Sequence, residues 1–120
     1  MKYGSFEDNN LKTVNEALEI AEDRTGNFYK FSLGQWKRQH YDVRTLSHLD
    51  HVEITSFAFA LLNTCPRSTA RFESKTKMRD FYLICLQDHQ ILKALNRDSN
   101  LKLLPLLVYV FTHELVHIVR

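Results

Sequence analysis

Residues 103–120 have the sequence LLPLLVYVFTHELVHIVR, and this stretch decides the fold that we predict. Between Leu106 and Phe111 its apolar residues fall on every side of a helix, which is typical of a helix buried at the centre of a domain. Because proline is tolerated in the first turn of a helix, Pro105 places the helix start near Leu101. We therefore predict a central buried helix over the last part of the chain.

The predicted helix carries an H-E-x-x-H motif made of His113, Glu114 and His117. Residues four positions apart project from the same face of a helix, one turn apart. Two imidazoles in this arrangement can bind one Zn²⁺ at roughly 2.0–2.1 Å, and the glutamate between them can accept a proton from metal-bound water. We expect His113 and His117 to be metal ligands and Glu114 to be the catalytic residue.

The strongest strand signal precedes this helix. Residues 80–88 (DFYLICLQD) form an apolar and aromatic run bounded by polar residues, which predicts a strand. A short helix is expected over 89–97, and residues 98–100 break the chain and can cap the last helix. Residues 54–64 fit a strand or a helix, and Pro66 ends either one.

The N-terminal part of the chain predicts a first helix over residues 7–24, with Gly26 as its stop signal. Its apolar positions recur at helical spacing at Leu11, Val14, Leu18 and Ala21. Two short strands are expected within 28–33 and 41–46. Together these elements predict a single α+β domain over 1–120, with an N-terminal helix, a small mostly antiparallel sheet and the buried C-terminal helix.

Length and composition are those of an ordinary globular domain: 120 residues, 44% hydrophobic and 25% charged, with a net charge of +2. Cys65 and Cys85 form no CxxC and no disulfide framework, so we expect reduced, buried thiols. The first residues contain no apolar signal-peptide core, and no apolar run is long enough to span a bilayer. We expect a cytoplasmic protein that is not embedded in a membrane.

The strand at 80–88 followed by the motif helix at 107–117 resembles the zincin metallopeptidases, and in particular the small predicted metallopeptidases of bacteria and archaea. This resemblance implies a zinc cofactor and hydrolysis of peptide bonds by metal-activated water. It also implies that the strand at 80–88 lies at the sheet edge and binds an extended peptide or protein substrate by strand addition.

Zincins take a third protein ligand from downstream of the motif, and only Ile118, Val119 and Arg120 follow it here. Three explanations stay open: a trimmed C-terminal segment, a vestigial site, or an upstream ligand. The upstream candidates are His51, Asp88 and His89. A truncated helix end would leave an apolar surface at Ile118 and Val119, so a homodimer through that end is a prediction.

Two alternatives from other functional classes remain. One is a non-catalytic protein of the same fold that binds a metal or a peptide. The other is a nucleic-acid-associated protein that uses the basic segment 67–79, although a solvated loop is the favoured interpretation of that segment. His48 and His51 are close enough in sequence to share a metal on a helix, and solvated histidines near a turn are favoured for them too.

Overall fold

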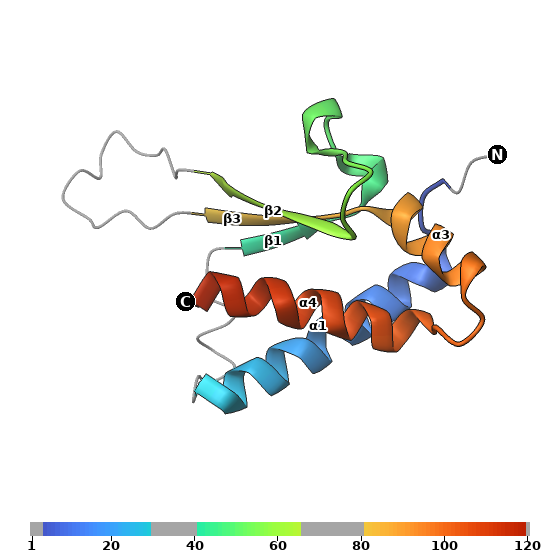
Figure 1. Ribbon diagram of the computed structural model, residues 1–120. Helices are drawn as coiled ribbons and strands as arrows, with labels where there is room; N and C mark the ends of the chain where they lie inside the picture. Colours follow the sequence, from blue (N-terminus) through green and yellow to red (C-terminus); the bar gives the residue numbers. More distant parts are fainter. Residues whose placement is uncertain (1–3, 30–40, 66–80, 120) are drawn as a thin grey trace.

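The computed structural model describes residues 4–29, 41–65 and 81–119. The elements, in chain order, are helix α1 (Asp8–Tyr29), strand β1 (Tyr41–Arg44), 3-10 turns η1 (Leu46–His48) and η2 (His51–Glu53), strands β2 (Ala60–Cys65) and β3 (Phe81–Leu86), and helices α3 (Asp88–Arg97) and α4 (Leu103–Val119). Figure 1 shows α1 and α4 on one side of the sheet and the segment with both 3-10 turns projecting on the other side. The predicted α+β class is confirmed.

The described strands form a mixed sheet in the order β1-β3-β2, with one parallel and one antiparallel pair, so the prediction of a mostly antiparallel sheet is wrong. β3 runs parallel to β1, with Tyr41 opposite Tyr82, and antiparallel to β2, with Ala60 opposite Leu86. The prediction that residues 80–88 form an edge strand is therefore wrong, because both edges of β3 are paired. Residues 83–86 are all buried, and a continuous buried run is what a central strand requires, since both of its faces are covered.

Helix α1 extends further than the sequence predicts. Gly26 does not stop it, and the helix continues to Tyr29. Glycine costs about 1 kcal/mol relative to alanine inside a helix, but Thr25 and Gly26 are both buried here. Packing at Thr25 and Gly26 offsets the unfavourable propensity of a single glycine.

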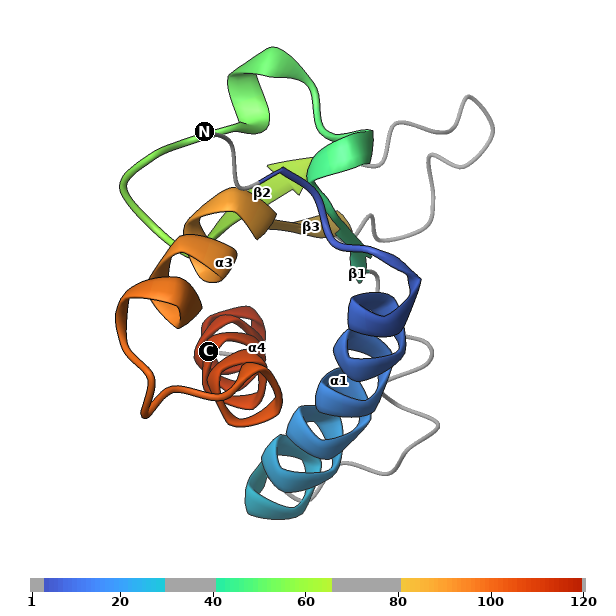
Figure 2. The same cartoon turned by 90° about the vertical axis from the view of Figure 1, so that its right-hand side faces the viewer.

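Helix α4 packs along α1, as the view down its axis in Figure 2 shows. Its buried face comprises Leu107, Val110, Phe111, Glu114 and Leu115. The opposite stripe is open, and the Tyr109 side chain is 65% exposed. The prediction that α4 is buried on every side is thus corrected, because the described elements cover one face of the helix and leave the other to solvent.

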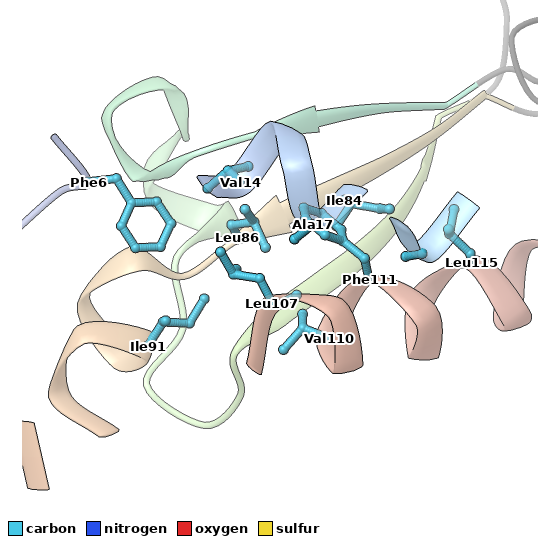
Figure 3. Packing of buried hydrophobic residues seen from close by; sticks show 12 residues of the cluster. Phe6, Val14, Ala17, Ile84, Leu86, Ile91, Leu107, Val110, Phe111 and Leu115 are labelled. Atoms are coloured by element: carbon cyan, nitrogen blue, oxygen red, sulfur yellow. The ribbon is translucent and has the colours of Figure 1, made fainter. Parts of the chain in front are cut away.

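The hydrophobic core lies between the sheet and the two long helices (Figure 3). Ile84 and Leu86 of β3 contribute to it from the sheet, and Phe111 of α4 is its largest fully buried side chain. Alternation along a strand sends every second residue to the same face, so this pair lies on the face that packs against α1 and α4. The core therefore holds α4 firmly against the central strand.

Two buried polar residues follow β3 and tie the irregular segments to it. The Asp88 carboxylate accepts hydrogen bonds from the backbone N–H groups of Phe6 at 2.7 Å and Leu46 at 3.0 Å. The Gln87 side chain accepts from the Thr55 N–H at 2.9 Å and donates to the Glu53 carbonyl at 2.8 Å. These bonds compensate for burying the polar side chains and hold the segment between β1 and β2 in one position.

The remaining predicted elements have mixed outcomes. Residues 54–64 are irregular up to Phe59 and become a strand from Ala60, so the helix alternative is wrong. The strand near 41–46, the strand at 80–88 and the helix near 89–97 are confirmed as elements. Phe28 and Tyr29 belong to α1, so a strand beginning at residue 28 is wrong. Residues 30–40 and the basic segment 67–79 lie outside the described residues.

No helix among the described residues is long and apolar enough to cross a membrane. Cys85 is fully buried in β3, as expected for a small apolar residue in a central strand.

Candidate functional site

The exposed stripe of α4 presents Tyr109, His113 and His117 at intervals of four residues. All three side chains are exposed, while the helix face opposite them packs into the core. The Tyr109 and His113 rings are stacked, with centroids 6.3 Å apart and planes inclined by 26°. The histidine pair is therefore accessible from solvent and mounted on a helix that the core holds rigidly.

The two histidines point their Nε2 atoms at one another. The Nε2–Nε2 distance is 3.3 Å, and the ring planes are inclined by 81°. Two nitrogens bound at 2.0–2.1 Å with a tetrahedral angle between them are separated by roughly 3.3–3.4 Å. The spacing of the two nitrogens thus fits a shared tetrahedral zinc ion without rearrangement. It also fits an imidazole–imidazole hydrogen bond, in which one Nε2–H donates to the other nitrogen.

Glu114 lies on the inner side of the same helix turn and is only 9% exposed. Burial raises the pKa of its carboxyl above the ordinary value, while the neighbouring imidazoles of His113 and His117 act in the opposite direction. A carboxyl whose pKa is raised towards the working pH can both accept and donate a proton during catalysis more effectively than a fully solvated carboxyl. The environment of Glu114 is therefore suited to acid–base chemistry.

A hollow of about 240 Å³ opens beside this turn, between α4 and the segment that leads into β2. Tyr109, Val110, His113 and Glu114 line it from the helix. Its other wall consists of Ala58, Phe59 and Ala60. His113 and Glu114 of the motif consequently border a concave, largely apolar surface, which is the usual setting of a small-molecule or peptide site.

The wall formed by residues 58–60 is held by the polar residues at the end of β3. The backbone N–H of Gln87 donates to the Phe59 carbonyl at 2.8 Å. The Nε2 atom of His89 lies 3.1 Å from the Thr55 carbonyl. These bonds fix the chain on both sides of Phe57, whose own side chain is 92% exposed.

The upstream candidates for a third metal ligand do not join the histidine pair. Among the described residues, no group of three His, Cys, Asp or Glu side chains could hold one metal ion. Asp88 binds the backbone of Phe6 and Leu46 instead, and His89 faces Thr55. His51 is exposed in η2, and His48 is exposed in the separate turn η1, so these two do not share a helix.

A larger hollow of about 590 Å³ lies between α1 and the segment from Asp42 to His48. It contains no residue of the H-E-x-x-H motif. Its lining mixes the apolar side chains of Leu11 and Leu18 with polar groups such as Asn15. A hollow that contains a titratable residue with a shifted pKa is a candidate functional site, so the smaller hollow beside Glu114 is chosen over the larger one.

The end of α4 bears on the predicted homodimer. Ile118 is partly buried and packs against the core of its own chain, so it is not the exposed apolar residue that the sequence predicts. Dimerisation through this end of the helix stays a prediction.

Sequence reasoning missed the residues around the motif. Tyr109 precedes His113 by four positions, so helical periodicity alone could have placed it on the same stripe. Ala58 and Phe59 carry no comparable signal, because only the pairing of β2 with β3 brings them near α4.

Comparisons of this chain with protein-family models, with curated proteins and with solved structures gave no match.

Proposed function

We propose that this protein is a zinc-dependent metallopeptidase or the core of one. The observation that carries the proposal is the 3.3 Å separation of the His113 and His117 Nε2 atoms, which equals the spacing of two nitrogen ligands on one tetrahedral zinc. The buried carboxyl of Glu114 and the adjoining hollow supply the other requirements of such a site.

In this proposal His113 and His117 hold the metal through Nε2, which requires that each Nδ1 carry the proton. A bound zinc ion would polarise the scissile carbonyl and lower the pKa of a coordinated water. Glu114 would act as the general base and general acid, accepting a proton from the attacking water and passing it to the leaving amine. Burial raises the pKa of this carboxyl above its ordinary value, which supports a role in proton transfer.

The edge strand β2 is the proposed path of the peptide substrate. Within the described part of the chain, β2 pairs with β3 on one side and with no other strand. An extended peptide can add to such an edge through backbone hydrogen bonds. The first residue of β2, Ala60, lines the hollow beside His113, so a peptide bound along this edge would reach the motif. This assignment replaces the strand at 80–88.

A catalytic zinc site usually has three protein ligands, and no third His, Cys, Asp or Glu among the described residues joins His113 and His117. This observation favours one alternative, a protein of the same fold that binds metal or peptide without catalysis. Glu114 distinguishes the two functions, because hydrolysis requires its carboxylate and metal binding by the two histidines does not.

The first experiment measures zinc per chain by elemental analysis on protein purified without chelator or nickel resin. We expect about one zinc per chain in the wild type and none in His113→Ala. His48→Ala is the matched control, since His48 is also exposed but lies outside the motif. Well-folded wild-type protein without zinc, even after zinc is supplied, would refute the metal centre.

The second experiment assays hydrolysis of a quenched fluorescent peptide library by zinc-loaded wild type and Glu114→Gln. For a peptidase, Glu114→Gln retains zinc and loses at least about a hundredfold in rate, the usual contribution of a general base. Equal zinc content with no hydrolysis by either protein would support the non-catalytic alternative.

A further inference from the structure

The hollow beside the motif is lined mainly by apolar and aromatic side chains, which have no role in the proposed hydrolysis. Three of its lining residues, Ala58, Phe59 and Ala60, form a continuous apolar wall, and Val110 lies opposite on α4. Among the described residues that line it, none is Lys, Arg, Asp, Asn or Gln. The small side chains at 58 and 60 leave the space open, and the aromatic rings of Phe59 and Tyr109 bound it.

We infer that this hollow is a specificity subsite that receives an apolar side chain of a bound peptide. The inference rests on the proposed function for its role in hydrolysis, because His113 and Glu114 form part of the same lining. The occupant must enter from solvent as a side chain on an extended backbone, since the hollow adjoins both the open stripe of α4 and the beginning of the edge strand β2.

The volume favours a branched aliphatic or a phenyl side chain. An apolar cavity of ~150 Å³ accommodates benzene, and this hollow measures about 240 Å³ while remaining partly open. A methyl group would leave most of the apolar wall in contact with water. A leucine side chain would cover it and gain the free energy of removing both surfaces from water.

The subsite is also preorganised. The Gln87 N–H holds the Phe59 carbonyl at 2.8 Å, and the Gln87 side chain holds Thr55 and Glu53. On the other wall, the buried neighbours Val110 and Phe111 fix α4 in the core. A ligand therefore finds both walls in place, and little binding free energy is lost in ordering them.

The test uses metal-free wild-type protein in chelator, so that peptides bind without being cleaved. Three probes, acetyl-Ala-Leu-Ala-amide and its central Ala and Lys analogues, are titrated into isotope-labelled protein and followed by amide NMR shifts. We expect the leucine peptide to bind at least about tenfold more tightly than the alanine peptide. Its shifts should map to residues 58–60 and 109–114.

The variant Ala58→Leu fills the hollow and should reduce the preference for leucine over alanine to less than about threefold. Ala94→Leu is the matched control, because Ala94 is also half-buried but lies on α3, and it should keep the preference. Tyr109→Ala removes one wall from an exposed position without disturbing the core, so it provides a second variant that should fold and should bind the leucine peptide more weakly.

Several results would overturn the subsite: no saturable shifts, shifts that map to the hollow between α1 and β1, or a leucine preference that survives Ala58→Leu. Tighter binding of the lysine peptide would also overturn it and would assign recognition to the Glu114 carboxylate. The metal centre is judged separately by the zinc content of His113→Ala, so failure of the proposed peptidase function and failure of the subsite give different results.

Discussion

Replacement of Gln87 by leucine tests how much one buried side-chain amide stabilises residues 53–55, which precede the wall of the candidate site. The Gln87 side chain accepts from the Thr55 N–H at 2.9 Å and donates to the Glu53 carbonyl at 2.8 Å and to the Cys85 carbonyl at 3.2 Å. Leucine has a similar volume but makes none of these bonds. The substitution therefore removes polar contacts while leaving no large cavity.

The expected magnitude follows from counting these bonds. Each ordinary hydrogen bond contributes about 1 kcal/mol net, and a buried group left without a partner costs about 1–3 kcal/mol. The two short bonds together with the longer third one give a loss of about 2–4 kcal/mol in the free energy of unfolding, partly offset by burying an apolar side chain. This is a large fraction of the stability of a typical domain, which is ~5–15 kcal/mol.

Urea unfolding measures the global effect, and an unchanged m-value would show that the comparison is valid. Amide hydrogen exchange measures the local one. The Thr55 amide should exchange at least about tenfold faster in Gln87→Leu, because it loses its acceptor. The β2–β3 pairing should stay protected, because it does not depend on the Gln87 side chain.

Gln90→Leu is the control, since Gln90 lies three residues further along, in the first turn of α3, and is half-buried. It should change the free energy of unfolding by less than about 0.5 kcal/mol, as surface-type substitutions do. The reasoning is refuted if Gln87→Leu is as stable as the wild type, or if Thr55 exchange is the same in both proteins.

Three further predictions concern the core, the buried carboxyl and the metal. Phe111→Ala should cost about 3–5 kcal/mol in urea unfolding, because it empties the centre of the core, whereas Tyr109→Ala on the exposed stripe should cost much less; similar losses would contradict the assigned burial. Burial raises the pKa of Asp88, so the folded state binds the carboxyl proton more tightly than the unfolded state does. Protonation of Asp88 therefore stabilises the fold at low pH, and this stabilisation is lost as the pH rises above the ordinary Asp pKa of 3.8 and through the raised pKa of the folded state. The stability of the wild type relative to Asp88→Asn should therefore decrease from pH 4 upwards, and a rising difference would reverse the sign of that argument. Zinc at a hundred times its Kd should stabilise the wild type by about 2.7 kcal/mol in thermal unfolding and should leave His117→Ala unchanged; equal stabilisation of both would place the zinc elsewhere.

The sequence by itself predicted the features that depend on local periodicity. The helical spacing of His113 and His117, the apolar run of β3 and the break at residues 98–100 each involve neighbours along one element. Such features follow from the 3.6-residue and two-residue periods of helix and strand. For that reason the α+β class and the pairing of the two histidines on one helix face could be anticipated.

Only the tertiary structure decided the features that depend on contacts between distant elements. The continuation of α1 through Gly26 follows from burial of Thr25 and Gly26, and the open stripe of α4 follows from packing on one side only. The central place of β3 arises because β1 and β2 pair with both of its edges, and this pairing also brings Ala58 and Phe59 beside Glu114. Pairing and packing of this kind are chosen by the free energy of the whole fold, which local patterns do not contain.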